Sequence, residues 1–226
     1  MPQLLVPFSF IGFDAVIYLL ASVIGFTVAF YALKMHNFTS NRSHFFLYLG
    51  FVVLSMGFFV LSISGFYTFF ALRVSCIHNC YALLFDQSFD VIDFGYYIYY
   101  LSSLVAYGLF VLMYLPLHRK DYKQKMFSVA PLWFVMFPFF HMFSIFLIAY
   151  VVFRSWVGFL QAKNYNSLSV FAAFLSIGAF HTILLLNIFS KEIYVLAHFI
   201  LVLGFLSLLT VLIRIIRKKP SILERL

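Results

Sequence analysis

Charged residues are scarce in this sequence of 226 residues, at 10% of the chain, whereas an ordinary soluble domain is about one quarter charged. With 65% hydrophobic and 22% aromatic residues, the chain is neither a soluble globular domain nor a disordered segment, which needs low hydrophobicity and high charge. Cysteine is scarce too, and two cysteines exclude a disulfide scaffold. The composition therefore predicts an all-α, polytopic membrane protein.

Six charge-free apolar stretches mark the predicted helices. Five have the length of one crossing, which takes about 20 residues. The stretch from Met126 to Leu160 is too long, because about 35 residues make a helix of about 50 Å. Pro138 could break it into two crossings. One long kinked helix and a re-entrant segment remain the alternatives.

Lysine and arginine distinguish six crossings from seven, because these residues concentrate in cytoplasmic loops. Six crossings would place seven of them on one face and eight on the other. Seven crossings leave only Arg73 and Lys191 outside and gather twelve inside. We therefore predict one seven-helix transmembrane domain over residues 1–226 in the cell membrane, N-terminus outside and C-terminus inside. Its helices are predicted at 11–33, 45–69, 93–116, 122–138, 140–161, 167–189 and 193–214, with a basic cytoplasmic tail at 215–226.

The two halves of the chain share features of a parallel repeat, three helices on each side of a linking helix. The run from Leu54 to Gly57 aligns with that from Leu175 to Gly178, and Gly108 aligns with Gly204. The first and fifth helices both run into polar linkers. Such a 3+1+3 plan places a central site between the two triplets. Apolar helices also resemble one another without duplication, so both interpretations stay open.

The run from Ser176 to Gly204, with one histidine in each of its two helices, resembles uncharacterised archaeal seven-helix membrane proteins. This resemblance covers about the last third of the chain and implies no activity. In size and orientation the chain resembles microbial rhodopsins, but Glu192 to Ile213 contains no lysine for a Schiff base, so retinal is not expected. The 3+1+3 plan resembles the small sugar transporters of the SWEET type, whose marker prolines are missing from the first and fifth helices.

His181 and His198 stand out inside the predicted bilayer, where ionisable groups are costly. They lie on antiparallel helices joined by a short turn, at depths that differ by only about 3 Å. Two facing histidines could hold haem b or a transition metal, and His141 could complete the cluster. Hydrogen bonding of each imidazole to a neighbouring helix is the favoured interpretation.

A second group of candidate metal ligands is Cys76, His78 and Cys80, in the predicted outer loop between the second and third helices. Two thiols and an imidazole suit a soft metal. The spacing is typical of neither a zinc finger nor a c-type haem attachment site. A disulfide or two free thiols is the favoured interpretation.

Other polar side chains are expected near the ends of helices. Asp14 and Asp93 are predicted to be solvated or placed beside a helix N-terminus, with an ion or proton entrance as the alternative. Arg154 is predicted to reach the interface by extending its side chain. Tyrosines that we expect at an outer interface are Tyr96, Tyr97, Tyr99 and Tyr100.

The C-terminal basic cluster predicts contact with membrane lipids, since each basic residue near an anionic leaflet contributes about 1 kcal/mol. Nucleic acid is not an expected partner, and a homo-oligomer or a membrane-protein partner stays open. The cluster consists of Arg214, Arg217, Lys218 and Lys219.

Motifs for hydrolysis or phosphoryl transfer are missing from the sequence, so we do not expect an enzyme. The first functional hypothesis is a non-catalytic, sensor-like or receptor-like module. The second is a membrane redox protein that holds haem b or a metal between His181 and His198. The third is a small transporter built on the 3+1+3 plan.

Overall fold

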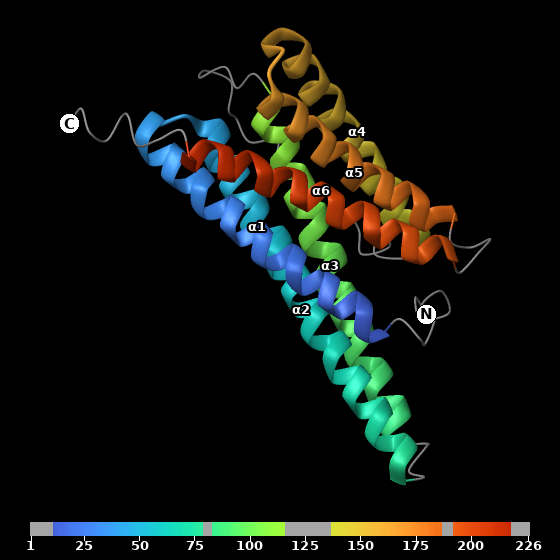
Figure 1. Ribbon diagram of the computed structural model, residues 1–226. Coiled ribbons are helices and arrows are strands. Elements are labelled where there is room, and N and C mark those ends of the chain that lie inside the picture. Colours follow the sequence, from blue (N-terminus) through green and yellow to red (C-terminus); the bar gives the residue numbers. More distant parts are fainter. Residues whose placement is uncertain (1–10, 79–82, 116–136, 187–191, 218–226) are drawn as a thin grey trace, which may run out of the picture.

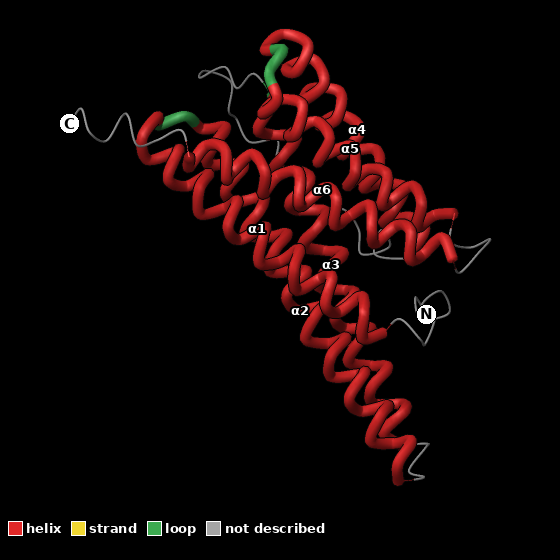
Figure 2. The backbone as a smooth tube through the Cα atoms, in the orientation of Figure 1, coloured by secondary structure: helices red, strands yellow, loops and turns green. Residues whose placement is uncertain are grey.

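The computed structural model describes residues 11–78, 83–115, 137–186 and 192–217, which form six α-helices and two short loops (Figures 1 and 2). Each helix is long and apolar enough to cross a membrane, and a helix satisfies its backbone hydrogen bonds internally, as lipid requires. The predicted multi-pass, all-helical character is therefore confirmed for the described residues. The helices are α1 (Ile11–Thr39), α2 (Arg42–His78), α3 (Leu83–Tyr114), α4 (Phe137–Ala162), α5 (Tyr165–Leu186) and α6 (Glu192–Arg217).

Six of the seven predicted helices correspond to a described helix. The predicted fourth helix, at 122–138, lies outside the described residues except for its last two positions. Those two, Phe137 and Pro138, begin α4, so their placement in the preceding helix was wrong. A proline in the first turn costs no hydrogen bond, because the first N–H groups of a helix have no acceptor within it.

The longest helices, α2 and α3, form an antiparallel hairpin. They have 37 and 32 residues, or about 55 and 48 Å, whereas their candidate membrane spans cover only Arg42–Ala71 and Asp90–Tyr114. The joined ends of the hairpin extend beyond the other helices at the lower end of Figure 1. The two backbones approach closely at Gly57, where a methyl group would lie 2.8 Å from Ser102 Cβ.

Two pairs of helices run parallel to each other. In α3 and α4, the Tyr100 and Phe140 rings stack with centroids 4.2 Å apart, and Tyr114 and Arg154, farther along each helix, line one cavity. Between α1 and α6, Asp14 contacts Tyr194, and further residue pairs follow in the same direction. The first triplet (α1 to α3) and the second triplet (α4 to α6) meet mainly through these two pairs (Figure 1).

The turns that join α1 to α2 and α4 to α5 have the same construction, and both are visible as short loops in Figure 2. Each helix is followed directly by a residue with positive φ, Ser40 at 51° and Lys163 at 46°. The backbone N–H of each donates to the carbonyl four residues earlier, at 2.7 and 2.8 Å. An asparagine follows in both turns, and its side chain accepts a backbone N–H of the next helix, Asn41 from Ser43 and Asn164 from Ser167.

Aromatic rings fill the middle of the bundle. Tyr96, Tyr99 and Tyr100 are buried, and of the four tyrosines expected at an interface only Tyr97 is exposed. Burial of the other three within the bundle does not fix their depth in a membrane, so the interface prediction stays a prediction. Their positions follow the spacing of one helical face, i, i+3 and i+4, and that face of α3 packs against the other helices.

Candidate functional site

A buried carboxylate joins α1 to α6. Asp14 is 3% exposed, and its Oδ2 accepts a hydrogen bond of 2.8 Å from the Tyr194 hydroxyl. Its Oδ1 accepts the backbone N–H of Ala15, also at 2.8 Å. The sequence predicted an exposed acid or one beside a helix N-terminus. The solvated alternative was wrong, because the side chain points into the contact with α6.

One turn farther along, α1 and α6 are joined again. The Tyr18 hydroxyl lies 2.6 Å from His198 Nε2, and His198 Nδ1 lies 2.8 Å from the Tyr194 carbonyl oxygen. A carbonyl only accepts, so Nδ1 carries the hydrogen, and in the neutral ring Nε2 accepts from Tyr18. We call Asp14, Tyr18, Tyr194 and His198 the acid network.

A second buried network connects three helices. His181 of α5 lies with its Nε2 2.7 Å from the Tyr107 hydroxyl of α3 and with its Nδ1 2.8 Å from His141 Nδ1 of α4. All three side chains are at most 1% exposed. We call them the histidine network. His141 therefore lies beside His181, at a buried position.

The two contacts of the histidine network join groups that can each donate or accept a hydrogen bond. In one arrangement Tyr107 donates to His181, which donates through Nδ1 to His141. In the other, His141 donates to His181, which donates through Nε2 to Tyr107. Both arrangements satisfy the same two contacts with neutral rings, so the chain of hydrogen bonds can reverse without moving a heavy atom.

Phenylalanine separates the two networks. The Phe180 ring has its centroid 5.2 Å from that of His181 and 5.5 Å from that of His198. The two histidines therefore lie near each other, with an apolar ring in contact with both. All three of these rings belong to the second triplet, His181 and Phe180 to α5 and His198 to α6.

A haem or metal between His181 and His198 fits this arrangement poorly. A ligating imidazole needs a free nitrogen lone pair, yet both ring nitrogens of each histidine have hydrogen-bond partners. Ligation would also require displacement of Phe180. Among the described residues, no three His, Cys, Asp or Glu side chains come together as a metal site. The interhelical hydrogen bonding favoured by the sequence is what the geometry provides.

The remaining predicted site residues lie apart from both networks. Cys76 and His78 belong to the last turn of α2, and Cys80 lies outside the described residues. Asp93 is half-buried on α3. Arg154 is exposed and lines a cavity. Of the basic C-terminal cluster, Arg214 and Arg217 fall in α6, whereas Lys218 and Lys219 lie outside the described residues.

Sequence reasoning missed the tyrosines that complete both networks, Tyr18, Tyr107 and Tyr194. Each lies well inside an apolar stretch or on the same helical face as a histidine or acid. An interface role explains only tyrosines near the ends of a crossing, so these positions were the signal that could have identified the three tyrosines. Comparison of the chain with protein-family models, with curated proteins and with solved structures finds no match.

Proposed function

We propose that this integral membrane protein is a small solute transporter built from two helix triplets around a linking crossing. The observation that carries the proposal concerns the buried ionisable groups. Every buried Asp or His among the described residues lies where the two triplets meet, and these are Asp14, His141, His181 and His198. Ionisable groups inside a membrane mark transport or relay pathways by default.

The directions of the helices support seven crossings. Tyr114 ends α3 near Arg154, in the C-terminal half of α4, so α3 and α4 run parallel. If α3 ends at one face of the membrane, a parallel α4 must begin at the opposite face. The chain that links the two helices therefore crosses the membrane an odd number of times. We infer a seventh crossing between Tyr114 and Phe137, as the distribution of basic residues predicts.

The matching turns support the repeat. Ser40 and Asn41 correspond to Lys163 and Asn164 in φ, in the backbone hydrogen bond and in the side-chain cap. A twofold exchange of the triplets would also map the α1/α6 contact onto the α4/α3 contact, and both contacts are parallel. Transporters with parallel repeats bind their substrates between the repeats, where the two networks lie.

Two-sided thiol labelling tests alternating access without knowledge of the solute. In a Cys76→Ser, Cys80→Ser background, Ser22→Cys reports on the region of the acid network and Ser103→Cys on that of the histidine network. Ser22 follows Tyr18 by one turn, and Ser103 precedes Tyr107 by one turn. The Ser22 hydroxyl is buried without a hydrogen-bond partner among the described residues, so its substitution loses no such bond. Ser103 lies beside the Tyr99 and Tyr107 hydroxyls, and cysteine keeps a weak donor there.

The protein is reconstituted in sealed vesicles of either orientation and treated with a membrane-impermeant maleimide. A transporter exposes each position in turn, so we expect both cysteines to react from both sides. Gln161→Cys, at an exposed helix end, is the positive control, and Leu101→Cys, exposed on the apolar surface of α3, is the lipid-facing control. Labelling from one side only would support the receptor-like alternative, and no labelling at either position would contradict transport.

A further inference from the structure

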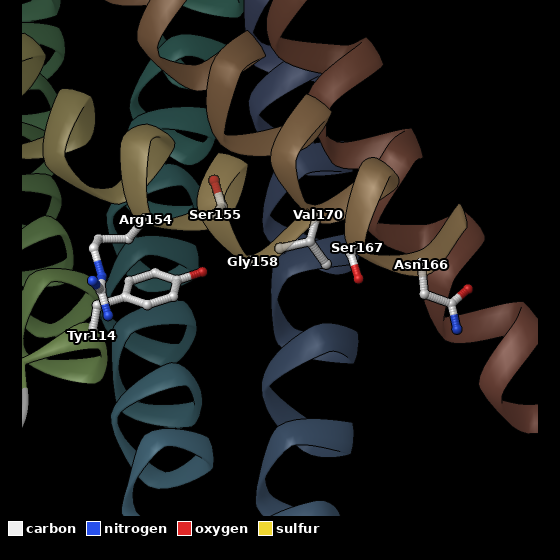
Figure 3. A pocket seen from close by; sticks show the side chains of 7 residues that line it. All are labelled: Tyr114, Arg154, Ser155, Gly158, Asn166, Ser167 and Val170. Carbon is white, nitrogen blue, oxygen red and sulfur yellow. The ribbon is translucent and has the colours of Figure 1, made fainter. Parts of the chain in front are cut away.

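A cavity of about 310 Å³, whose lining includes Arg154, lies between the C-terminal ends of α3 and α4 and the start of α5. Figure 3 shows the Arg154 guanidinium beside the Tyr114 ring on one side and Asn166 and Ser167 on the other. Arginine, a tyrosine hydroxyl and an asparagine amide all supply donor hydrogens. The cavity therefore presents donors, including a fork of guanidinium N–H groups, to whatever occupies it.

This end of the second triplet is positively charged. Arg214 lies over the Tyr165 ring, 5.7 Å from its centroid, next to Asn166. Lys163 occupies the adjoining turn. The three acids whose side chains the structure describes, Asp14, Asp90 and Asp93, lie toward the opposite ends of α1 and α3, so none of these three neutralises Arg154. We propose that the cavity binds a phosphate group, either the headgroup of an anionic lipid or a soluble phosphate.

Gly158 makes room for such a group. It lines the cavity, and a Cβ atom at this position would meet nothing within 4 Å. Packing among the described residues therefore does not require glycine there, although glycine weakens a helix by about 1 kcal/mol relative to alanine. A larger side chain would occupy the space that the phosphate needs while Arg154 keeps its charge.

Binding to the purified full-length protein in neutral detergent tests the proposal. Native mass spectrometry with dioctanoyl phosphatidylglycerol measures the lipid source, with dioctanoylglycerol as the control that lacks phosphate. Equilibrium dialysis with radiolabelled inorganic phosphate measures the soluble source. We expect Arg154→Gln to raise the dissociation constant of the preferred probe at least about tenfold, because hydrogen bonds to charged groups are strong.

Gly158→Leu should weaken binding as much as Arg154→Gln does, without loss of charge, and it provides the test if the arginine variant does not fold. Arg214→Gln removes a charge from the same end outside the cavity and should change the dissociation constant less than twofold. If these two cavity variants lose only lipid binding, the ligand is a lipid headgroup. If they lose binding of inorganic phosphate, the ligand is a soluble phosphate. Equal weakening by Arg154→Gln and Arg214→Gln, or unchanged binding in Gly158→Leu, would overturn the proposal.

Discussion

The acid network and the histidine network differ in how firmly their hydrogen atoms are placed. In the acid network, both Asp14 oxygens and the Tyr194 carbonyl accept, so Tyr194, His198 and Tyr18 each donate in one direction. In the histidine network, every group can either donate or accept, so the contacts among Tyr107, His181 and His141 fit two opposite directions.

The difference teaches how one bundle can combine a fixed contact with an adjustable one. A carboxylate held by two donors ties α1 to α6 with a single polarity. The reversible network instead joins α3, α4 and α5, and a proton gained or lost at one end of it can be followed by reorganisation at the other. We therefore expect the acid network to hold the triplets together and the histidine network to respond when they move.

The largest expected effect is on the free energy of unfolding, when His181 or His198 is replaced by alanine. His181→Ala and His198→Ala each leave a cavity, at a cost of about 2–5 kcal/mol in the free energy of unfolding. His181→Ala also loses two bonds between helices, whereas His198→Ala loses one, since its other partner is in its own helix. Leu101→Ala, at an exposed position on the apolar surface of α3, is the control. In detergent, the free energy of unfolding should fall by about 1 kcal/mol more for His181→Ala than for His198→Ala. A larger fall for His198→Ala would contradict the difference between the two networks.

Removal of one tyrosine hydroxyl from each network tests the difference in charge. Tyr194→Phe takes a donor from a carboxylate, at an expected cost of about 1.5–3 kcal/mol, and Tyr107→Phe removes a neutral bond worth about 0.5–1.5 kcal/mol. The same unfolding measurement compares them. If Tyr107→Phe cost as much as Tyr194→Phe, Asp14 would have to be protonated, and the fixed polarity of the acid network would be lost.

Double-mutant cycles measure the individual contacts. Tyr18→Phe combined with His198→Ala, and Tyr107→Phe combined with His181→Ala, should each give a coupling energy of about 0.6–1.7 kcal/mol, as for other hydrogen bonds between membrane helices. A cycle between Tyr18 and His181, which belong to different networks, is the control and should give a value near zero. Strong coupling in that control would mean that Phe180 does not isolate the networks.

The smallest effect concerns only hydrogen positions. In nitrogen-15 NMR spectra of histidine-labelled protein, His198 should show one neutral tautomer with its hydrogen on Nδ1. His141 and His181 should show shifts averaged between two tautomers, because their network reverses. Assignment by the corresponding alanine variants identifies each signal. A single tautomer at His181 would make the two networks alike.

The sequence predicted the described helices well, because long charge-free stretches leave few alternatives. Six predicted cores match α1 to α6, while the ends differ because α2 and α3 continue past the apolar stretch, as far as His78 and from Leu83. Hydropathy reports where lipid begins and not where a helix stops. Pro138 was misplaced for a related reason, since a proline breaks a helix or starts one according to its position in the turn.

The candidate site was predicted only in part. His181 and His198 stood out in the sequence because ionisable residues are rare in the apolar stretches. Their partners depend on the contacts between α1 and α6 and between α3 and α5, which join residues far apart in the chain. No local pattern reports these pairings. For the same reason Asp14, near a helix end in the sequence, was predicted to be more exposed than it is.

The two matching turns also bear on how the protein reaches its membrane. Ser40 and Asn41 are the whole loop between α1 and α2, and Lys163 and Asn164 are the whole loop between α4 and α5 (Figure 2). With linkers so short, neither helix of a pair can enter the bilayer far ahead of its neighbour without drawing the turn in after it. Each pair should therefore be inserted during synthesis as one hairpin, with its asparagine-capped turn left at the surface.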